Sequence, residues 1–262
     1  MITNPVDIAK QVTRWTNLGI DLPEDLITAL DRFEALQFVE VGHRPVFDLE
    51  SVTAENAEEK VREFAEVLAN HIPMRLQDGV SATVLESSKS WALNEAALAV
   101  KRTAAQSIPQ IIEDIEPRFE EHAEAYAEAA LKLPETITSD TLVKAGPETL
   151  AAYGVAKAEA AYIGGISSWV NQTAEVTGVR STGGFLNVLA PDDAVQLAKL
   201  DQVSLSTNTD RTFAEVVPVY FTAVRLGVPF RIKTPREASA LRKELELALR
   251  SQSQRPTGVA FA

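Results

Sequence analysis

The sequence predicts a mainly α protein, in which an acidic helical bundle or antiparallel coiled-coil region is followed by a small C-terminal α/β (α+β) module. Apolar residues recur with heptad spacing in two long segments, Pro and Gly mark the helix ends, and strand-like runs appear only late in the chain. We divide the chain into an N-terminal helix pair with an extended segment (1–52), a long-helix bundle (53–178), the α/β module (179–252) and a flexible tail (253–262).

The first segment reads as two short helices. Asn4 is a favourable N-cap, Pro5 suits the first helical position, and Gly19 ends this helix. Asp21 is expected to cap a second helix. Between residues 23 and 40 there are five acidic residues and a single Arg, which is the wrong sign for phosphate contact. We therefore expect no nucleic acid as a partner.

Three long helices are predicted in the first part of the bundle. They cover residues 53–72, about 80–107, and 109–133, and each junction contains Pro or Gly. Because the links between them are short, we expect the three helices to fold back on one another as antiparallel neighbours.

Two of these helices carry a heptad seam, in which apolar residues alternate at steps of three and four. The seam of the third helix consists of Ile108, Ile112, Ile115, Phe119, His122, Tyr126, Ala129 and Leu133. The seam of the first helix consists of Ala57, Val61, Phe64, Leu68 and His71.

Two of the three histidines lie in these seams. One hypothesis is a buried polar layer in which His71, Glu95, Arg102 and His122 pair and fix the helix register or titrate near neutral pH. The simpler alternative is that each His has one hydrogen-bond partner, near a helix end or in a partly open seam. Neither His follows a Glu at the spacing of a dinuclear metal site, so we expect no metal and no cofactor.

The α/β module is predicted to follow a long helix over 147–177. Runs of strand type at 185–190, 203–206 and 229–233 alternate with helices, and the last helix begins at Thr234. This alternation is typical of a small α/β or α+β fold.

Charge is distributed unevenly along the chain. Residues 1–150 contain 13 basic and 27 acidic residues, a net charge of −14, whereas residues 151–262 have a net charge of +2. On the last helix, basic residues can dock an acidic partner, such as the acidic region of another copy. The alternative is an ordinary exposed face with interleaved glutamates. The candidate partner-binding residues are Arg236, Arg242, Lys243 and Arg250.

Catalytic residues are scarce. The chain has no Cys and only three His, so a thiol nucleophile is excluded. Tyr153 and Lys157 resemble the Tyr-x-x-x-Lys pair of short-chain dehydrogenases, but the chain lacks the glycine-rich turn and N-terminal strand of a dinucleotide fold. The two are ordinary helix neighbours, and we predict no catalytic residues.

These observations favour a non-enzymatic structural or assembly protein that self-associates or docks into a larger particle, such as a virion. One alternative is a small-ligand enzyme whose site on the C-terminal module uses Arg180, Asp192, Asp210 and Arg231. Another is an acidic inhibitory binder that mimics nucleic acid through a row formed by Glu113, Glu116, Glu120 and Glu124. With no signal or spanning segment in the sequence, we expect a cytoplasmic protein, including one packaged into a particle, and no membrane partner.

Overall fold

The computed structural model describes residues 4–43, 45–75, 81–179, 184–206 and 209–253. This part of the chain is mostly helical, which confirms the mainly α prediction. None of its helices combines the length and the hydropathy that crossing a bilayer requires. The predicted flexible tail lies outside the described residues, apart from its first position.

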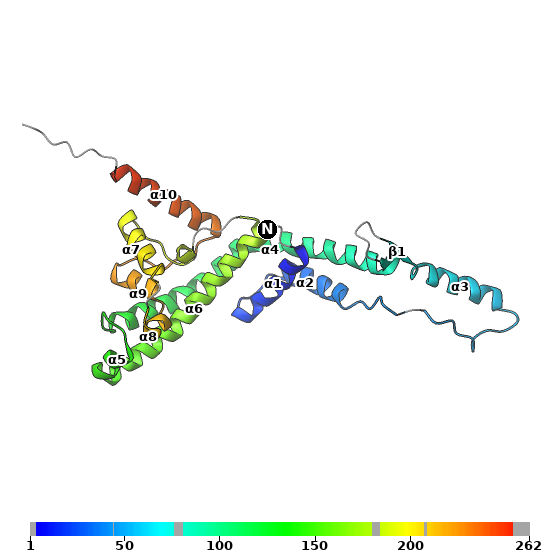
Figure 1. Ribbon diagram of the computed structural model, residues 1–262, viewed down its shortest axis with the longest axis horizontal. Coiled ribbons are helices and arrows are strands. Elements are labelled where there is room, and N and C mark those ends of the chain that lie inside the picture. The colour runs from blue at the N-terminus through cyan, green and yellow to red at the C-terminus, as the bar shows by residue number, and fades with distance from the viewer. Residues whose placement is uncertain (1–3, 44, 76–80, 180–183, 207–208, 254–262) are drawn as a thin grey trace, which may run out of the picture. The chain divides into compact units, whose positions relative to one another are not determined.

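Two compact units make up the chain (Figure 1). Unit 1 consists of Met1–Thr13 and Pro23–Ala104, and unit 2 of Arg14–Leu22 and Ala105–Ala262. The chain therefore passes between the units three times, the third time within a continuous helix. The bounds of the four segments drawn from the sequence stay predictions.

Unit 1 contains three short helices, a two-stranded antiparallel sheet and the first part of a long helix. These are α1 (Pro5–Thr13), α2 (Glu24–Gln37), α3 (Ala57–Ala69), β1 (Pro73–Arg75), β2 (Ser81–Thr83) and α4 (Val84–Leu131).

The start of α1 is as predicted and that of α2 is not. Asn4 caps α1 by accepting a 3.0 Å hydrogen bond from the backbone N–H of Val6. Asp21 is not the cap of α2, which begins at Glu24 with Pro23 as its N-cap residue. A helix capped at Asp21 would need helical geometry in the residue directly before Pro23, and proline disfavours that geometry in its predecessor.

The core of unit 1 lies between α1, α2 and one stretch of α4. Its buried apolar residues are Ile8, Ala9, Val12, Leu26, Leu30, Phe33, Ala97, Val100 and Ala104. Between Glu34 and Ala96, none of the residues whose exposure the structure describes is buried. We call residues 34–96 the extension of unit 1.

Unit 2 contains the rest of α4 and six further α-helices, together with two 3-10 turns, in the described residues. In chain order its other elements are η1 (Arg14–Leu18), α5 (Ser139–Ala145), α6 (Pro147–Thr177), η2 (Gly184–Asn187), α7 (Ala194–Ser204), α8 (Arg211–Glu215), α9 (Pro218–Arg225) and α10 (Pro235–Ser253).

The core of unit 2 forms where α4 and α6 lie side by side (Figure 1). Trp15 of η1 packs edge to face against Trp169 of α6, with 5.7 Å between the ring centroids. The buried Tyr126 hydroxyl of α4 donates a 2.7 Å hydrogen bond to the Val216 carbonyl. The predicted seam of the third helix is largely confirmed, because six of its members are buried, namely Ile108, Ile115, Phe119, Tyr126, Ala129 and Leu133.

The predicted break between the second and third long helices is wrong. Residues 84–131 form one helix, α4, with Pro109 and Pro117 inside it. Pro109 lacks the N–H that would bond the carbonyl four residues earlier. Ile108 and Ile111, on either side of it, are both buried, so tertiary packing holds the helix together across the proline. The predicted antiparallel pairing of these two helices is therefore also wrong.

The seam predicted for the first long helix is present but not buried. No residue of α3 is buried, and the Val61 side chain is 57% exposed. The three-helix bundle that was expected to cover this seam does not form, because α4 continues in one direction instead of folding back.

The predicted C-terminal α/β module is not supported. Residues 185–187 lie in η2, and of the next three only Leu189 forms a bridge. Residues 203–206 lie at and just beyond the end of α7. Residues 229–233 are extended, but they form only one isolated antiparallel bridge, between Phe230 and Leu189, with backbone hydrogen bonds of 2.9–3.0 Å beside it. Residue 229 is a proline and has no backbone N–H to donate. This helps to prevent the single bridge from extending into a sheet.

Candidate functional site

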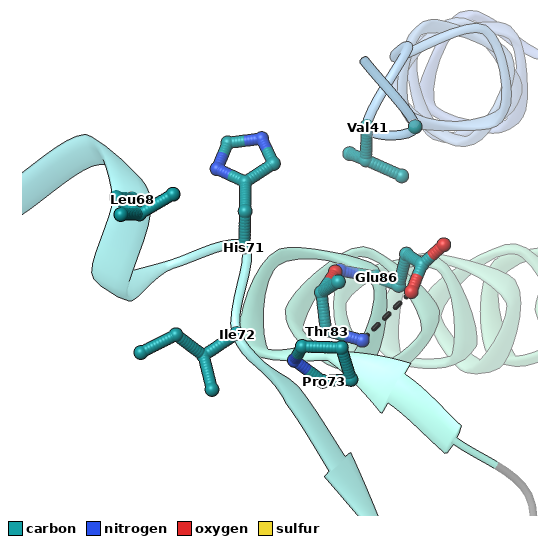
Figure 2. A pocket seen from close by; sticks show the side chains of 8 residues that line it. Val41, Leu68, His71, Ile72, Pro73, Thr83 and Glu86 are labelled. Atoms are coloured by element: carbon teal, nitrogen blue, oxygen red, sulfur yellow. Dashed lines mark hydrogen bonds between the residues drawn. The ribbon is translucent and has the colours of Figure 1, made fainter. Parts of the chain in front are cut away.

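A pocket of about 530 Å³ opens in the extension of unit 1. Figure 2 shows its lining, which comes from the segment before α3, the end of α3, the start of β1 and the start of α4. The lining residues are Val41, Gly42, Leu68, His71, Ile72, Pro73, Thr83 and Glu86.

Local hydrogen bonds position the floor of this pocket. Thr83 and Glu86 form a capping box at the start of α4, in which Glu86 Oε2 accepts from the Thr83 N–H at 2.7 Å and Thr83 Oγ1 accepts from the Glu86 N–H at 3.1 Å. The Leu85 N–H donates to the Asn70 carbonyl at 3.2 Å. The first turn of α4 is thereby tied to the end of α3.

The polar side of the pocket is formed by Glu86 and His71. The pKa of Glu86 is lowered, mainly because the Thr83 backbone N–H and side chain hydrogen-bond its carboxylate, while the charge of His71 adds a smaller effect. His71 Nδ1 lies 2.9 Å from the Val67 carbonyl oxygen. In Figure 2 the imidazole ring lies between the side chains of Leu68 and Val41.

This arrangement suits the binding of apolar groups better than catalysis. The Glu86 carboxylate is already engaged by Thr83, so a substrate proton would compete with the cap. Leu68, Ile72 and Val41 supply an apolar wall that a partner side chain can cover. Among the described residues no group of three acidic or His side chains is placed to hold a metal ion.

Exposed large apolar side chains occur along the whole extension, both before and after the pocket residues in the sequence. Val46 is 88% exposed, Phe38 76% and Trp91 71%. Large apolar side chains scattered singly are normal on a surface, and unit 2 also has several of them. The extension differs because it has no buried residue among those whose exposure the structure describes. The exposed large apolar residues of the extension are Phe38, Val39, Val46, Leu49, Val61, Val67, Leu68, Ile72 and Trp91.

The four residues proposed for a buried polar layer have separate environments. His71 is half-buried and bonds a backbone carbonyl one turn before it. Glu95 and Arg102 have exposed side chains on α4, and the Arg102 Nε donates to a carbonyl one turn earlier. His122 belongs to unit 2, where its side-chain partner is Glu159. Each histidine thus has the kind of partner that the simpler alternative describes.

His122 is part of a small polar cluster that joins α4 to α6. Its Nδ1 lies 2.5 Å from Glu159 Oε2, and its ring stacks on Tyr162 with 3.8 Å between the centroids. The Arg118 guanidinium lies 5.5 Å from the Tyr162 ring centroid. Burial raises the pKa of Tyr162, Glu159 raises it further, and Arg118 opposes the shift.

The Tyr153 and Lys157 pair holds α6 to α8. The Tyr153 hydroxyl donates to Glu215 Oε2 at 2.7 Å, and Lys157 Nζ lies 2.8 Å from the same oxygen. Burial and the Glu215 hydrogen bond raise the pKa of Tyr153 to about 12. Dehydrogenase chemistry needs a lowered pKa at this Tyr, so the geometry is that of a structural contact.

The four basic residues of α10 divide into two groups. Arg236, Lys243 and Arg250 have exposed side chains. Arg242 is only 20% exposed, and its guanidinium bonds both carboxylate oxygens of Asp201 in α7 at 2.9 and 3.1 Å. The face of α10 that includes Arg242 packs against α7, so this side chain is not available to an external partner.

The residues of the enzyme alternative do not form a site. Asp210 caps α8 by accepting a 2.8 Å hydrogen bond from the Thr212 N–H. Asp192 and Arg231 are exposed, and Arg180 lies outside the described residues. The strand ends that were to hold these residues are not formed.

The acidic row proposed as a nucleic-acid mimic is present on α4. Glu113, Glu120 and Glu124 are exposed and Glu116 is half-buried. Their spacing keeps them within one sector of the helix surface. Mimicry of nucleic acid by this row stays a prediction.

The pocket in the extension was not among the predicted sites, although one local signal was available. Thr83-x-x-Glu86 is the sequence signature of a capping box, and it marks the true start of α4. Val41 and Gly42 carry no comparable signal, because only the tertiary fold brings them to the pocket.

No protein-family profile matches this sequence, and comparison with curated proteins and with solved structures finds no significant similarity.

Proposed function

We propose that this chain is a non-enzymatic structural or assembly protein that self-associates, or docks into a larger particle such as a virion, through the extension of unit 1. The observation that carries the proposal is that residues 34–96 display heptad-spaced and scattered apolar side chains, while no residue among them whose exposure the structure describes is buried. An amphipathic helix gains most of its stability from packing its apolar face. In α3 only Phe64 has an aromatic partner, Phe47 at 5.1 Å between ring centroids, and Val61 and Leu68 stay exposed, so a further surface would stabilise the helix.

A second copy is the partner that best fits this surface. The seam of α3 has the four-three spacing of helices that pair with one another, and isologous contact between two copies is the commonest form of assembly. Leu68 and Ile72 line the pocket at the end of α3 and are 38% and 55% exposed. Two paired extensions would bring apolar side chains of each copy to the pocket of the other.

Sedimentation velocity tests the proposal. We expect the wild-type chain to sediment as a dimer or larger species at micromolar concentration, and the Val61→Gln/Leu68→Gln variant to sediment as a monomer. Both side chains are exposed, so these changes leave the fold of the single chain intact. The matched control is Val143→Gln/Leu205→Gln in unit 2, which changes two side chains that are 70% and 79% exposed and should leave association unchanged.

Two results would contradict the proposal. One is a wild-type chain that stays monomeric at about 100 μM in both 0.05 M and 1 M salt. Over this range the Debye screening length changes about fourfold. The other is an equal loss of association in the test variant and in the control variant.

An acidic binder is a second candidate, favoured by the three exposed glutamates in a row on α4. It predicts a monomer that binds a basic protein, and that binding should weaken when Glu113, Glu120 and Glu124 are replaced by Gln. A basic DNA-binding domain serves as the probe, and competition by duplex DNA is the expected signature of mimicry.

A further inference from the structure

The last helix, α10, has two faces of different character. Its inner face packs Ala238 and Leu245 into a cluster with Leu186 and Leu197, and Leu241 lies against that cluster. At 100° per residue, this inner face is centred near Leu245. The inner face therefore fixes α10 to unit 2 and leaves the opposite face exposed.

The opposite face carries basic side chains in a heptad pattern. Its members follow at steps of four, three, four and three, and we call them the basic stripe, consisting of Arg236, Ala240, Lys243, Leu247 and Arg250. All five are exposed, and Leu247 is 64% exposed. The interleaved Glu237 and Glu244 lie about 80–100° around the helix from the centre of the stripe. Basic and acidic residues that are interleaved in the sequence therefore lie on different sides of the helix.

A groove of about 510 Å³ lies elsewhere on unit 2, between the end of α4 and the start of α6. Its floor is made by Ala125 and Ala129 of α4 and by Ala151 and Ala152 of α6. Small side chains in both helices allow a third helix to approach closely. We call this the acidic groove, because Glu128 and Glu148 line it.

The charge around the groove is acidic overall. Lys132 also lines it, but Glu121 and Glu124 are exposed one helical turn before Ala125 and Glu128. The basic stripe has no acidic member. Among the described residues Arg236 and Lys243 have no ion pair that would occupy them.

The stripe and the groove also match in length. The α4 side of the groove, from residue 125 to residue 132, spans seven positions, which is about 10 Å along a helix. Arg236 and Lys243 are also seven positions apart, and so are Ala240 and Leu247. Ala240 and Leu247 would contact the alanine floor while the two basic residues lie beside the glutamates.

We infer that the basic stripe of α10 docks into the acidic groove of a second copy of this chain. This inference rests on the proposed function and names a second, electrostatic surface for it. The same copy cannot fill its own groove, because the inner face holds α10 near η2, whose Asn187 bonds Asn171 of α6 at 2.9 Å. That point is 16 residues, or about 24 Å, from Val155 of the groove. Because the stripe and the groove are different surfaces, the contact is head to tail and can repeat.

A charge exchange tests this contact. Arg236→Glu/Lys243→Glu and Glu128→Lys/Glu148→Lys should each weaken the contact at least about tenfold, because like charges then face each other. An equimolar mixture of the two variants should restore association. The acidic stripe of the first variant fits the basic groove of the second, and the unchanged basic stripe of the second fits the unchanged acidic groove of the first. Lys10→Glu/Lys199→Glu is the control, because it makes the same change in net charge on exposed side chains elsewhere and should have no effect.

Engineered cysteines test the docking geometry directly, because the chain has no Cys of its own. We expect Ala240→Cys of one preparation and Ala151→Cys of another to form a disulfide-linked heterodimer under mild oxidation. A chain carrying both changes should form a covalent ladder. The control pair is Ala240→Cys with Val195→Cys, because Val195 is an exposed residue of α7. An internal disulfide in the double variant, or no more heterodimer than in the control pair, would overturn the inference.

The two associations are distinguished by salt and by variant. Contact through the stripe and groove should weaken steeply between 0.05 M and 0.5 M salt, whereas apolar contact through the extension should persist. If Val61→Gln/Leu68→Gln abolishes all association and the charge variants change nothing, the proposed function stands and the inference fails. If the charge variants alone act, the inference stands and the extension is not the interface.

Discussion

The core of unit 2 and the extension of unit 1 differ in how they place their tryptophan side chains. Unit 2 buries its large aromatic side chains, and both Trp15 and Trp169 are fully buried in its core. In unit 1 the only Trp, Trp91, is 71% exposed, and between residues 34 and 96 no residue whose exposure the structure describes is buried. Burial of apolar surface provides most of the free energy of folding. Unit 2 is therefore stabilised by burial within its own chain. The extension of unit 1 has no comparable burial, and the proposed function rests on this difference.

The comparison also applies to ionisable groups. All four tyrosines of the chain lie in unit 2, where the pKa of each is raised, for all four mainly by burial. Unit 1 has no Tyr. Alkaline conditions that ionise tyrosine should therefore lower the stability of unit 2 more than that of unit 1.

The largest expected effect is the loss of a core side chain in unit 2. Trp169→Ala should lower the free energy of unfolding by about 3–5 kcal/mol, because it removes a fully buried ring that packs on Trp15. Urea unfolding followed by circular dichroism measures this loss. The matched change in unit 1, Trp91→Ala, should cost less than about 0.5 kcal/mol. Equal losses in the two variants would refute the contrast between the units.

Alkaline pH should destabilise unit 2 selectively. The pKa of Tyr220 is raised to about 12, from an ordinary value near 10. A raised folded pKa means that its contribution is complete below pH about 10 and is lost as the pH rises toward 12. For Tyr220 alone the loss approaches about 3 kcal/mol. Urea unfolding of Trp91→Phe, in which fluorescence reports only Trp15 and Trp169, should show this decline, and Tyr220→Phe should reduce it. A flat profile would contradict the prediction.

A smaller effect is expected from one buried hydrogen bond. Tyr126→Phe should destabilise unit 2 by about 1–2 kcal/mol, because the Val216 carbonyl then stays buried without its donor. The change keeps the ring and its packing. The midpoint of urea unfolding should fall with no change in slope, and Tyr153→Phe, whose hydroxyl is less buried, serves as the comparison. No shift in the midpoint would show that this bond contributes nothing.

The smallest effect is expected in the extension itself. Val61→Ala/Leu68→Ala should change the stability of the monomer by no more than about 0.5 kcal/mol, since both side chains are exposed in the single chain. The measurement belongs at a concentration low enough to keep the chain monomeric. A loss of 2 kcal/mol or more, near the usual cost in a core, would show that the extension has a core of its own.

Helix ends in unit 2 were predictable wherever local chemistry sets them. Pro147 opens α6 and Gly178, with φ of 71°, ends it, as their positions in the sequence indicate. Pro109 gave the same kind of signal, yet α4 runs through it because buried residues on both sides favour continuity. Local signals fix a boundary only where packing does not oppose them.

The candidate site was less predictable than the fold. The heptad spacing of Val61, Phe64 and Leu68 shows that one face of α3 is suited to burial, but it does not show which chain covers it. The predicted answer was the neighbouring helices of the same chain. In the structure Val61 and Leu68 stay exposed, and Phe64 packs on Phe47 from the segment before α3. Arg242 and Lys243 illustrate the same limit. They are adjacent in sequence, but Arg242 is paired with Asp201 and Lys243 is exposed.

The contact between Trp15 and Trp169 has a consequence for synthesis of the chain. Residues 14–22 leave the ribosome early, between the helices α1 and α2, but their packing partner follows 154 residues later. At 5–20 residues per second this delay is about 8–30 s. During that time the indole of Trp15 lacks the ring that it packs against in the folded chain. The edge-to-face contact can form only after most of α6 has emerged, so this part of the core of unit 2 is completed late in synthesis.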